Sequence, residues 1–364
     1  MQPVSNIIVG LSGGVDSAVA ALLLKQQGHT VSAVFMKNWD EDDEQDYCPV
    51  EKDLADARAI AEKLEIELHT VSFSAQYWNR VFAHFLGEIE AGRTPSPDII
   101  CNREIKFSAF LDYATELGAD FIATGHYARI EQTPPVRLLK GLDKRKDQTY
   151  FLHTLSREQL AKSLFPLGEY AKTEVRKIAE SEGFDNYAKK DSTGICFIGE
   201  RRFSEFLSRY VKKNPGEIRT LDNRLLGQHD GLMFYTIGQR QGLGIGGRRD
   251  SSGKPWYVVD KDMENNLLRV AQGVNHPALF SSALHASQLY WISGKDIISP
   301  CKCTARIRHQ QPLQACSMTV QPGSLCTVRF DSPQRAITPG QSIVFYHEDE
   351  CLGGAIIEEA VPDK

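Results

Sequence analysis

The sequence predicts an α/β fold in which a doubly wound parallel sheet is followed by a small linking domain and a C-terminal β-barrel. In the first half, short apolar runs alternate with segments of helical periodicity, which is typical of parallel strands joined by helices. After about Tyr210, glycines become frequent and long helical periods disappear. From Leu284 onward, short β-type runs alternate with turns, a pattern that indicates a small barrel. We therefore expect domains at residues 1–205, 206–275 and 276–364.

Hydrophobic periodicity predicts the individual elements. Apolar runs predict buried strands of the first domain over residues 7–9, 30–36, 67–73 and 120–124. Helical spacing of apolar residues predicts helices over residues 17–25, 51–64, 77–91, 104–117 and 172–183. Strands of the barrel are expected over residues 301–307, 315–320, 325–330, 342–346 and 355–359. Ligands of a parallel sheet lie beyond the carboxyl ends of its strands, so residues that follow the strands are candidates for the site.

Length and composition exclude membrane and secreted classes. With 364 residues, of which 41% are hydrophobic and 24% charged, the chain fits a globular protein of two or three domains. No apolar run approaches the roughly 20 residues of a membrane span. The N-terminus lacks the basic segment and apolar core of a secretory signal. We therefore expect a cytoplasmic protein with no membrane partner.

Charge is distributed unevenly along the chain. The net charge is −5, yet residues 201–249 hold ten basic and four acidic side chains. Such a region can bind the phosphate backbone of a nucleic acid, and a solvated charged face remains an equal alternative. Six of the seven residues at 40–46 are acidic, which favours a solvated loop over a docking site for a basic partner protein.

One stretch near the start carries the clearest chemical signal. The apolar run at residues 7–9 leads into Gly10-Leu-Ser-Gly-Gly-Val-Asp-Ser17, and a helical segment follows at once. A strand, a glycine turn and a helix start present backbone N–H groups and the positive end of the helix to an anion. Gly13 and Gly14 let the backbone approach a phosphate closely, and the two serines offer hydroxyl donors. The stretch lacks the Gly-Lys-Ser/Thr of a Walker loop, so a different class of phosphate site is predicted.

Two cysteines have unusual neighbours. Cys101 follows two prolines and Asp98, and a helix is expected to start near residues 102–104, so its thiol would lie at a helix N-terminus, where the thiolate is favoured. Asp98 is close enough in sequence to exchange a proton. Cys196 lies between Ile195 and Phe197. On these grounds alone a buried structural thiol remains open for both. The other cysteines are predicted to be structural: Cys48, Cys301, Cys303, Cys316, Cys326 and Cys351.

Residues 12–17, Ser-Gly-Gly-Val-Asp-Ser, resemble the PP-loop of ATP pyrophosphatases, and the chain as a whole resembles the tRNA 2-thiouridylases, which thiolate the wobble uridine at position 34. The second resemblance rests on ordered motifs along most of the chain. They are Pro97–Asn102, Ala123–Arg129, Lys146–Leu152, Ser192–Ile198, Tyr235–Gly244, Ala305–Arg308, Thr338–Gln341 and Cys351–Gly354. A PP-loop alone would leave amide-forming enzymes equally open.

The resemblance implies an ATP-dependent sulfurtransferase that adenylates the C2 oxygen of the uridine and replaces it with sulfur from a cysteine persulfide. Its cofactors would be ATP and Mg²⁺, and its partners the anticodon stem-loop of tRNA and a protein that donates persulfide sulfur. The family places the persulfide on Cys196, makes Cys101 the partner thiol that ends in a disulfide with Cys196, and makes Asp98 the acid or base. The resemblance assigns ATP binding to Gly10, Leu11, Ser12, Gly13, Gly14, Val15, Asp16, Ser17, Met36 and Gly125. It assigns tRNA contacts to Ser96, Pro97, Asp98, Lys146, Asp147, Gln148, Arg308 and His309.

Three residues depart from the family pattern. Ser96, Thr149 and His309 stand where the family commonly has Asn, Ser and Tyr. Each replacement retains a polar group or a flat ring, so the departures affect the details of base contact rather than the reaction. Two other functions stay open: a PP-loop ligase that forms amides or amidines, and a non-catalytic tRNA-binding protein that responds to ATP. The first gives Cys101 and Cys196 no role, and the second predicts that both can be replaced without loss of function.

Overall fold

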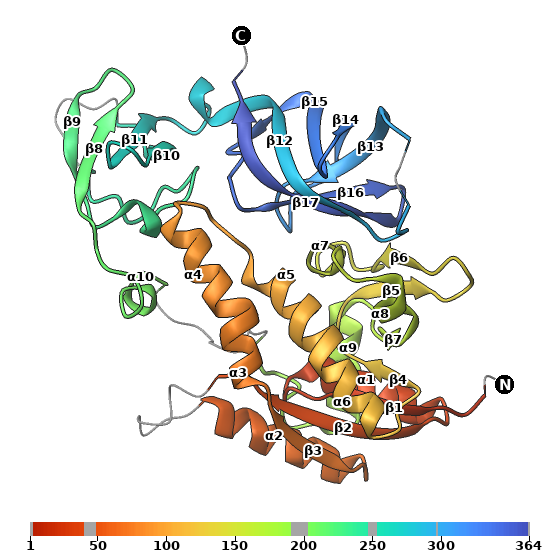
Figure 1. Cartoon of the computed structure of the whole chain (residues 1–364). Coiled ribbons are helices and arrows are strands. Elements are labelled where there is room, and N and C mark those ends of the chain that lie inside the picture. Colours follow the sequence, from red (N-terminus) through yellow and green to blue (C-terminus); the bar gives the residue numbers. More distant parts are fainter. Residues whose placement is uncertain (1–2, 40–48, 191–202, 247–252, 296–297, 363–364) are drawn as a thin grey trace.

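The computed structural model describes residues 3–39, 49–190, 203–246, 253–295 and 298–362. A parallel sheet forms the N-terminal part, a small sheet follows it, and a closed barrel forms the C-terminal part (Figure 1). The predicted fold class is therefore confirmed. Among the helices that the structure describes, none is long and apolar enough to cross a membrane.

The first sheet has five parallel strands in the order β3-β2-β1-β4-β7. β1 lies in its centre because the strand is apolar on both faces: Ile7 and Val9 pack into one core, and Ile8 packs into the other. The strands are β1 (Asn6–Gly10), β2 (Thr30–Lys37), β3 (Leu68–Ser72), β4 (Phe121–Ala123) and β7 (Ser163–Leu164). All four predicted strands are present, whereas the two residues of β7 are too few to give a periodic signal.

Helices cover both faces of this sheet, as a doubly wound fold requires (Figure 1). Residues of α1, α2 and α9 fill one core, and residues of the helical stretches within 74–116 fill the other. The helices that the structure describes in this part of the chain are α1 (Val15–Gln26), α2 (Pro49–Lys63), α3 (Ser74–Tyr77), the π-helical η1 (Trp78–Phe82), α4 (Ala83–Glu90), α5 (Pro97–Cys101), the π-helical η2 (Asn102–Ala109), α6 (Phe110–Glu116), α7 (Thr149–Leu152), α8 (Arg157–Ala161) and α9 (Lys172–Ser181).

The helix that carries Cys101 begins earlier than the sequence predicts. α5, η2 and α6 follow one another without a break, so the helical stretch starts at Pro97 rather than near residues 102–104. Proline suits the first helical position because its φ is already helical and its missing N–H needs no partner there. The thiol of Cys101 lies beyond the first turn, so the expectation of a thiol at the helix N-terminus is wrong.

The middle sheet has the order β10-β11-β8-β9 and a small apolar core of its own that includes Ile218, Val258 and Leu268. Its strands are β8 (Gly216–Thr220), β9 (Leu225–His229), β10 (Trp256–Asp262) and β11 (Leu267–Gln272). The helix α10 (Phe203–Leu207) precedes them, and the short 3₁₀ helix η3 (Leu232–Phe234) lies between β9 and β10. Figure 1 shows this sheet beside the barrel.

Six strands close the barrel in the order β12-β15-β14-β13-β16-β17, and β17 pairs with β12. They are β12 (Phe280–Trp291), β13 (Cys301–Arg306), β14 (Gln314–Gln321), β15 (Leu325–Arg335), β16 (Ser342–His347) and β17 (Glu350–Val361), with the 3₁₀ helix η4 (Pro277–Leu279) before β12. A hairpin of β5 (Ala128–Glu131) and β6 (Arg137–Lys140) extends the sheet by pairing Leu138 with Cys351. No local pattern signals this long-range pairing, and the domain boundaries remain predictions.

Candidate active site

The glycine turn, residues 10–17, connects the end of β1 to the start of α1. Gly13 has φ +72°, and a Cβ at this position would lie 2.2 Å from the carbonyl oxygen of Asp53, so only glycine fits. The Ser17 hydroxyl donates to the Gly14 carbonyl over 3.1 Å, and it accepts from the Ser12 amide over 3.2 Å. These bonds fix a turn whose amides precede the N-terminus of a twelve-residue helix, which is the geometry of an anion site.

The structure brings the predicted ATP-binding residues together at one edge of the sheet. A Cβ at Gly10 would lie 3.2 Å from the Met36 side chain, which joins the ends of β1 and β2. A Cβ at Gly125, just beyond β4, would lie 2.8 Å from the backbone of Asp16 and of Ser17. These close approaches explain why glycines occur at the carboxyl ends of two neighbouring strands, β1 and β4, at the edge where doubly wound sheets bind ligands.

Sequence reasoning missed the side chains that hold Asp16. Lys172 donates from Nζ to both carboxylate oxygens of Asp16 over 2.7 Å, and the Tyr127 hydroxyl donates to Oδ1 over 2.7 Å. Lys172 is buried at the start of α9, more than 150 positions from its partner. The motif Ala123–Arg129 contains Tyr127 and could have suggested it, whereas no local signal marks Lys172.

A second group of polar side chains fastens the glycine turn from outside. Lys189 binds Asp53 over 2.8 Å and Asp56 over 2.6 Å, and its Nζ lies 3.3 Å from the Gly13 carbonyl. Asn186 donates to the same carbonyl over 3.0 Å. The pKa of Lys189 is raised because the two carboxylates outweigh the cost of partial burial. The turn is therefore held between α2 and the segment after α9.

The glycine turn and the residues beside it fit a nucleoside triphosphate. The open amides of the turn suit the phosphates, and the apolar floor of Gly10 and Met36 suits a base or ribose. Within the described ranges no group of three His, Cys, Asp or Glu side chains could hold a metal ion. Mg²⁺ commonly binds through substrate phosphates, waters and one or two carboxylates, so such a group is not a requirement for it.

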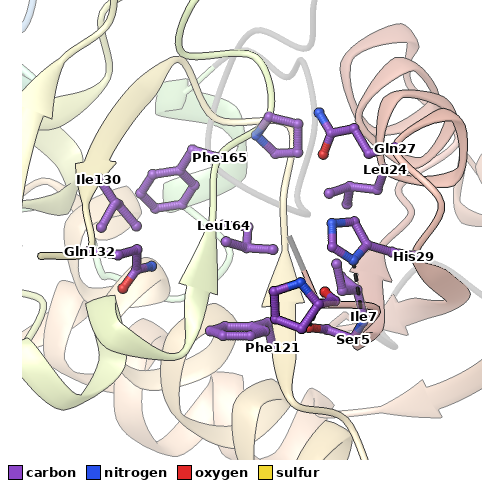
Figure 2. Close-up of a pocket in the computed structure, with 12 residues that line it drawn as sticks. Ser5, Ile7, Leu24, Gln27, His29, Phe121, Ile130, Gln132, Leu164 and Phe165 are labelled. Carbon is purple, nitrogen blue, oxygen red and sulfur yellow. Dashed lines mark hydrogen bonds between the residues drawn. The ribbon is translucent and has the colours of Figure 1, made fainter. Parts of the chain in front are cut away.

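One cavity of the described residues lies at the other edge of the sheet. It has a volume of about 380 Å³ and lies beside the amino ends of β1 and β4, with Ser5, His29 and Phe121 in its wall (Figure 2). Its polar groups are already engaged in part, since the Ser5 amide donates to His29 and Gln132 donates to the Ser163 carbonyl. Among the described residues that line it there is no cysteine and no carboxylate. The chemistry therefore points to the glycine turn rather than to this cavity.

Asp98 and Cys101 lie on the first two turns of the helical stretch 97–116. Asp98 is half-buried, whereas the Cys101 side chain is 0% exposed in the apolar core. Phe110, further along the same stretch, lies under Gly10, so one element joins the predicted thiol to the glycine turn. The eight residues of the π-helical η2 lie between Cys101 and Phe110. Cys196, the predicted partner of Cys101, lies outside the described residues, as do Cys48 and the acidic residues 40–46.

The segment that leads to Asp98 is anchored by the barrel and the middle sheet. The Thr94 amide donates to the Pro339 carbonyl over 2.8 Å, and Gln341 donates to the Thr94 carbonyl over 2.6 Å. The Thr94 hydroxyl also lies 3.4 Å from that of Thr236. The motif Thr338–Gln341 thus positions residues 94–98. Ser96 is half-buried and Pro97 is buried.

The predicted tRNA residues of two distant motifs meet in one place, which we call the loop–barrel contact (Asp147, Thr149 and Tyr150 with Arg306, His309, Ser342 and Tyr346). Asp147 is 2% exposed; it accepts from Arg306 over 2.8 Å and from the Thr149 hydroxyl over 2.9 Å. The Tyr150 hydroxyl donates to the Ser342 carbonyl over 2.8 Å. The Asp147 carboxylate therefore faces the interior of the protein. The tRNA contact of Asp147 remains a prediction, and it concerns the loop that contains Asp147 rather than this carboxylate.

The remaining predicted tRNA residues border this contact. His309 donates from Nε2 to the Asp147 carbonyl over 2.9 Å, and its ring centre lies 4.4 Å from that of Phe151. Burial lowers the pKa of His309, which keeps the ring neutral at pH 7. Arg308 donates to the Ala336 carbonyl over 2.5 Å, and Gln148 accepts from the Tyr127 amide over 2.9 Å. Lys146 is half-buried on the same loop.

The basic region at 201–249 is partly neutralised within the described residues. Lys213 pairs with Asp230 over 2.9 Å, and Arg219 pairs with Glu217 over 2.6 Å. The exposed basic side chains are Arg209, Lys212, Lys213, Arg224 and Arg240. The region keeps enough exposed positive charge for a polyanion, and its role stays a prediction.

Family models match all three parts of the chain. Residues 5–200 match "tRNA methyl transferase HUP domain", residues 204–272 match "tRNA methyl transferase PRC-barrel domain", and residues 281–357 match "Aminomethyltransferase beta-barrel domain". A structure titled as the U34-tRNA thiolase NcsA from Methanococcus maripaludis covers 56% of this chain and 64% of its own at 19% identity, with a TM-score of 0.35. That likeness is too distant to carry an argument.

The family models carry methyl transferase and aminomethyltransferase names, whereas relatives that match almost the whole chain carry a different one. The protein named tRNA-specific 2-thiouridylase MnmA from Stutzerimonas stutzeri is 57% identical over 359 residues, which are 98% of this chain and 96% of that protein. A protein of the same name from Pseudomonas fluorescens is 58% identical over 98% of this chain and 95% of its own length. Such identity over the full length is more specific than the domain descriptions, and the expected resemblance is confirmed. The chain belongs to the tRNA-specific 2-thiouridylase family of PP-loop proteins.

Proposed function

We propose that this protein is an ATP-dependent tRNA sulfurtransferase that converts the wobble uridine of tRNA to 2-thiouridine. One observation carries the proposal: the helical stretch that begins at Pro97 bears Asp98 and Cys101 at one end and packs Phe110 against Gly10 of the glycine turn. The helical stretch that carries the thiol thus packs directly against the strand end where the anion site begins. Membership of the 2-thiouridylase family supports the same reaction.

In the first step, the C2 oxygen of the flipped uridine attacks the α-phosphate of ATP and pyrophosphate leaves. The amides of residues 13–15 and the N-terminus of α1 stabilise the charge that develops on the phosphates. Bound Mg²⁺ would supply further positive charge at the phosphates. Lys172 and Tyr127 hold Asp16 in place beside the turn. The oxygen becomes part of AMP, which is a far better leaving group than the original oxygen.

In the second step, the terminal sulfur of a persulfide on Cys196 attacks C2, and AMP leaves. Asp98 exchanges the protons. Cys101 then attacks the inner sulfur of Cys196, which breaks the sulfur–sulfur bond, leaves the sulfur on the base and forms a disulfide between the two cysteines. An external reductant restores both thiols, and a persulfide-bearing donor protein reloads Cys196. Since Cys101 is fully buried, this sequence requires the core beside α5 to open when tRNA binds.

Recognition of tRNA would use the ends of three structural units. Residues 94–98 are held against the barrel by the bond from Gln341 to the Thr94 carbonyl, and the loop 146–148 contacts the barrel residue His309. An unpaired base in the anticodon loop can be stacked on flat side chains, and the Phe151–His309 pair offers such a surface. The exposed basic residues of the middle domain would bind the phosphate backbone.

Mass spectrometry of nucleosides tests this proposal. Purified protein is incubated with unmodified tRNA, Mg-ATP, a persulfide-bearing sulfur donor and a thiol reductant, and the digested tRNA is analysed for 2-thiouridine. We expect thiouridine to depend on ATP and to be lost in Cys196→Ser. A folded protein that produces no thiouridine while releasing pyrophosphate in the presence of a small amine would instead indicate a PP-loop ligase.

A further inference from the structure

Two cysteines outside the proposed active site lie side by side on neighbouring strands of the barrel. Cys303 on β13 and Cys316 on β14 are directly opposite in the antiparallel register, and their Sγ atoms lie 3.7 Å apart. Directly opposite residues of an antiparallel pair have Cα atoms about 4.5–5.5 Å apart, which is within the range that a disulfide spans. No movement of the strands is required to bring the two sulfurs together.

The surroundings make the two thiols unequal. The Cys316 thiol acts as a hydrogen-bond partner that lowers the pKa of Cys303, and the neighbouring Cys301 acts in the same direction. The same contact and burial raise the pKa of Cys316. Cys303 is half-buried, whereas Cys316 is 4% exposed. Cys303 is therefore the sulfur that an outside reagent can reach as a thiolate, and Cys316 is the protected thiol behind it.

Neighbouring cysteines are less suited to either role. Burial raises the pKa of Cys301, and it raises that of Cys326 to about 12. Cys326 lies opposite Val320 rather than opposite another cysteine. Within the described ranges the cluster also does not qualify as a metal site. The pairing of Cys303 with Cys316 is thus the arrangement that the register favours.

We propose that Cys303 and Cys316 form a redox-active dithiol that small disulfides of the glutathione class oxidise to an intrachain disulfide. The Cys303 thiolate attacks one sulfur of glutathione disulfide, which forms a mixed disulfide and releases one glutathione thiolate. Cys316 loses its proton to solvent, and its sulfur attacks the sulfur of Cys303. The second glutathione leaves, and the Cys303–Cys316 bond remains. The dithiol loses two electrons and two protons, and glutathione disulfide gains them as two thiols.

This device is separate from the sulfur-transfer cysteines, yet it lies on a strand that reaches the loop–barrel contact. β13 ends at Arg306, three positions after Cys303, and Arg306 carries the ion pair to Asp147. A disulfide would tie β13 covalently to β14 next to this contact. Oxidation of Cys303 and Cys316 would thereby constrain β13, the strand whose Arg306 connects the barrel to Asp147 of the N-terminal domain.

Peptide mapping tests the proposal on the full-length protein without tRNA or ATP. The reduced protein is incubated with glutathione disulfide, quenched with N-ethylmaleimide under denaturing conditions and digested with trypsin. Cleavage after Lys302 and Arg306 separates Cys301 from Cys303. We expect peptide 303–306 linked to peptide 309–329, which contains Cys316 and Cys326, with fragmentation placing the bond on Cys316. Labelling of Cys303 and Cys316 by maleimide should fall at least about tenfold.

Two variants sharpen the result. In Cys316→Ser the reaction should stop at the mixed disulfide, with one glutathione retained on Cys303. In the matched control Cys326→Ser, which removes another buried barrel thiol, the Cys303–Cys316 link should form as before. Full labelling of Cys303 and Cys316 even in pure glutathione disulfide, or a link from Cys303 to Cys301 or Cys326 instead, would overturn the proposal.

Discussion

The glycine turn and the loop–barrel contact are built in opposite ways. The glycine turn is local: within eight consecutive residues, a strand end, a glycine at positive φ and a helix start define its shape. The loop–barrel contact joins residues more than 150 positions apart, and its ion pair is almost completely buried. The comparison indicates that the shape of the proposed ATP site is encoded in backbone geometry, whereas the position of the loop predicted to contact tRNA depends on side chains from two domains.

The largest effect is expected from a substitution in the glycine turn, the locally defined region of this comparison. In Gly13→Ala the new Cβ meets the Asp53 carbonyl at 2.2 Å, and alanine is strained at φ +72°. The turn must shift, and a displacement of about 1 Å at a reacting centre can cost on the order of 100-fold in rate. We expect tRNA-dependent pyrophosphate release to fall by about that factor, measured by a coupled phosphate assay.

Gly14→Ala is the matched control. Gly14 has φ −89°, and a Cβ there approaches only the flexible Ser12 hydroxyl at 3.3 Å. This variant should lose less activity than Gly13→Ala, because alanine adopts this conformation without strain and only the room for a phosphate beside the turn is reduced. Equal losses in both variants would show that the backbone conformation at Gly13 is not the important feature.

The second prediction concerns the loop–barrel contact, which depends on residues far apart in the sequence. Arg306→Met leaves the buried Asp147 carboxylate without its cationic partner, and such a loss typically costs about 3–5 kcal/mol. We expect the free energy of unfolding to fall by about 3 kcal/mol, since Asp147 keeps its bonds to Thr149. Urea denaturation followed by tryptophan fluorescence measures this loss.

The double variant Asp147→Asn with Arg306→Met provides the control. It removes both charges, so it should be more stable than Arg306→Met alone. If the single and double variants were equally unstable, burial of an unpaired charge would not be the cause.

The third prediction concerns pH. Burial lowers the pKa of His153 from 6.5 to about 4, against a weaker opposing effect of its hydrogen bond to the Tyr150 carbonyl. Below pH 6.5 the unfolded chain takes up a proton that the folded chain does not, so stability is complete above pH 6.5 and falls between pH 6.5 and 4. For this fully buried ring the loss amounts to about 3 kcal/mol at pH 4.

His153→Gln should therefore flatten the dependence of unfolding free energy on pH between 6.5 and 4. The exposed His347 offers the matched control, because His347→Gln should leave the slope unchanged. Since the comparison uses slopes, a loss of packing that is independent of pH does not affect it. An unchanged slope in His153→Gln would contradict the burial of a neutral ring.

The smallest effect is expected for Tyr127→Phe. The variant loses the 2.7 Å hydrogen bond to Asp16, while Lys172 still binds both carboxylate oxygens. A hydrogen bond to a charged group is worth about 1.5–3 kcal/mol, and we expect the lower end, roughly tenfold in kcat/KM for ATP, because Lys172 still holds the carboxylate. Steady-state pyrophosphate release measures it, with Tyr113→Phe on α6 as the control. A loss as large as that of Gly13→Ala would mean that side chains, rather than the backbone, dominate the glycine turn.

Sequence reasoning reached the local features and missed those that depend on distant partners. The Ser12–Ser17 motif predicted the turn, and alternating apolar runs predicted the strands of the first sheet and most of the barrel. The predicted helix start at residues 102–104 is too late because a proline is compatible both with extended backbone and with the first helical position, and Pro97 occupies the latter. Lys172, Arg306 and the β5–β6 hairpin act through contacts far along the chain, which no window of sequence contains.

The origin of the oxygen in AMP tests the central claim, that the glycine turn activates the tRNA itself. The reaction is run in water enriched in the heavy oxygen isotope, with ordinary tRNA, and AMP is analysed by mass spectrometry. If the C2 oxygen of uridine attacks ATP, AMP receives its new oxygen from tRNA and carries no label. AMP that carries the heavy isotope in proportion to thiouridine formed would show that water attacks instead, and would contradict the account.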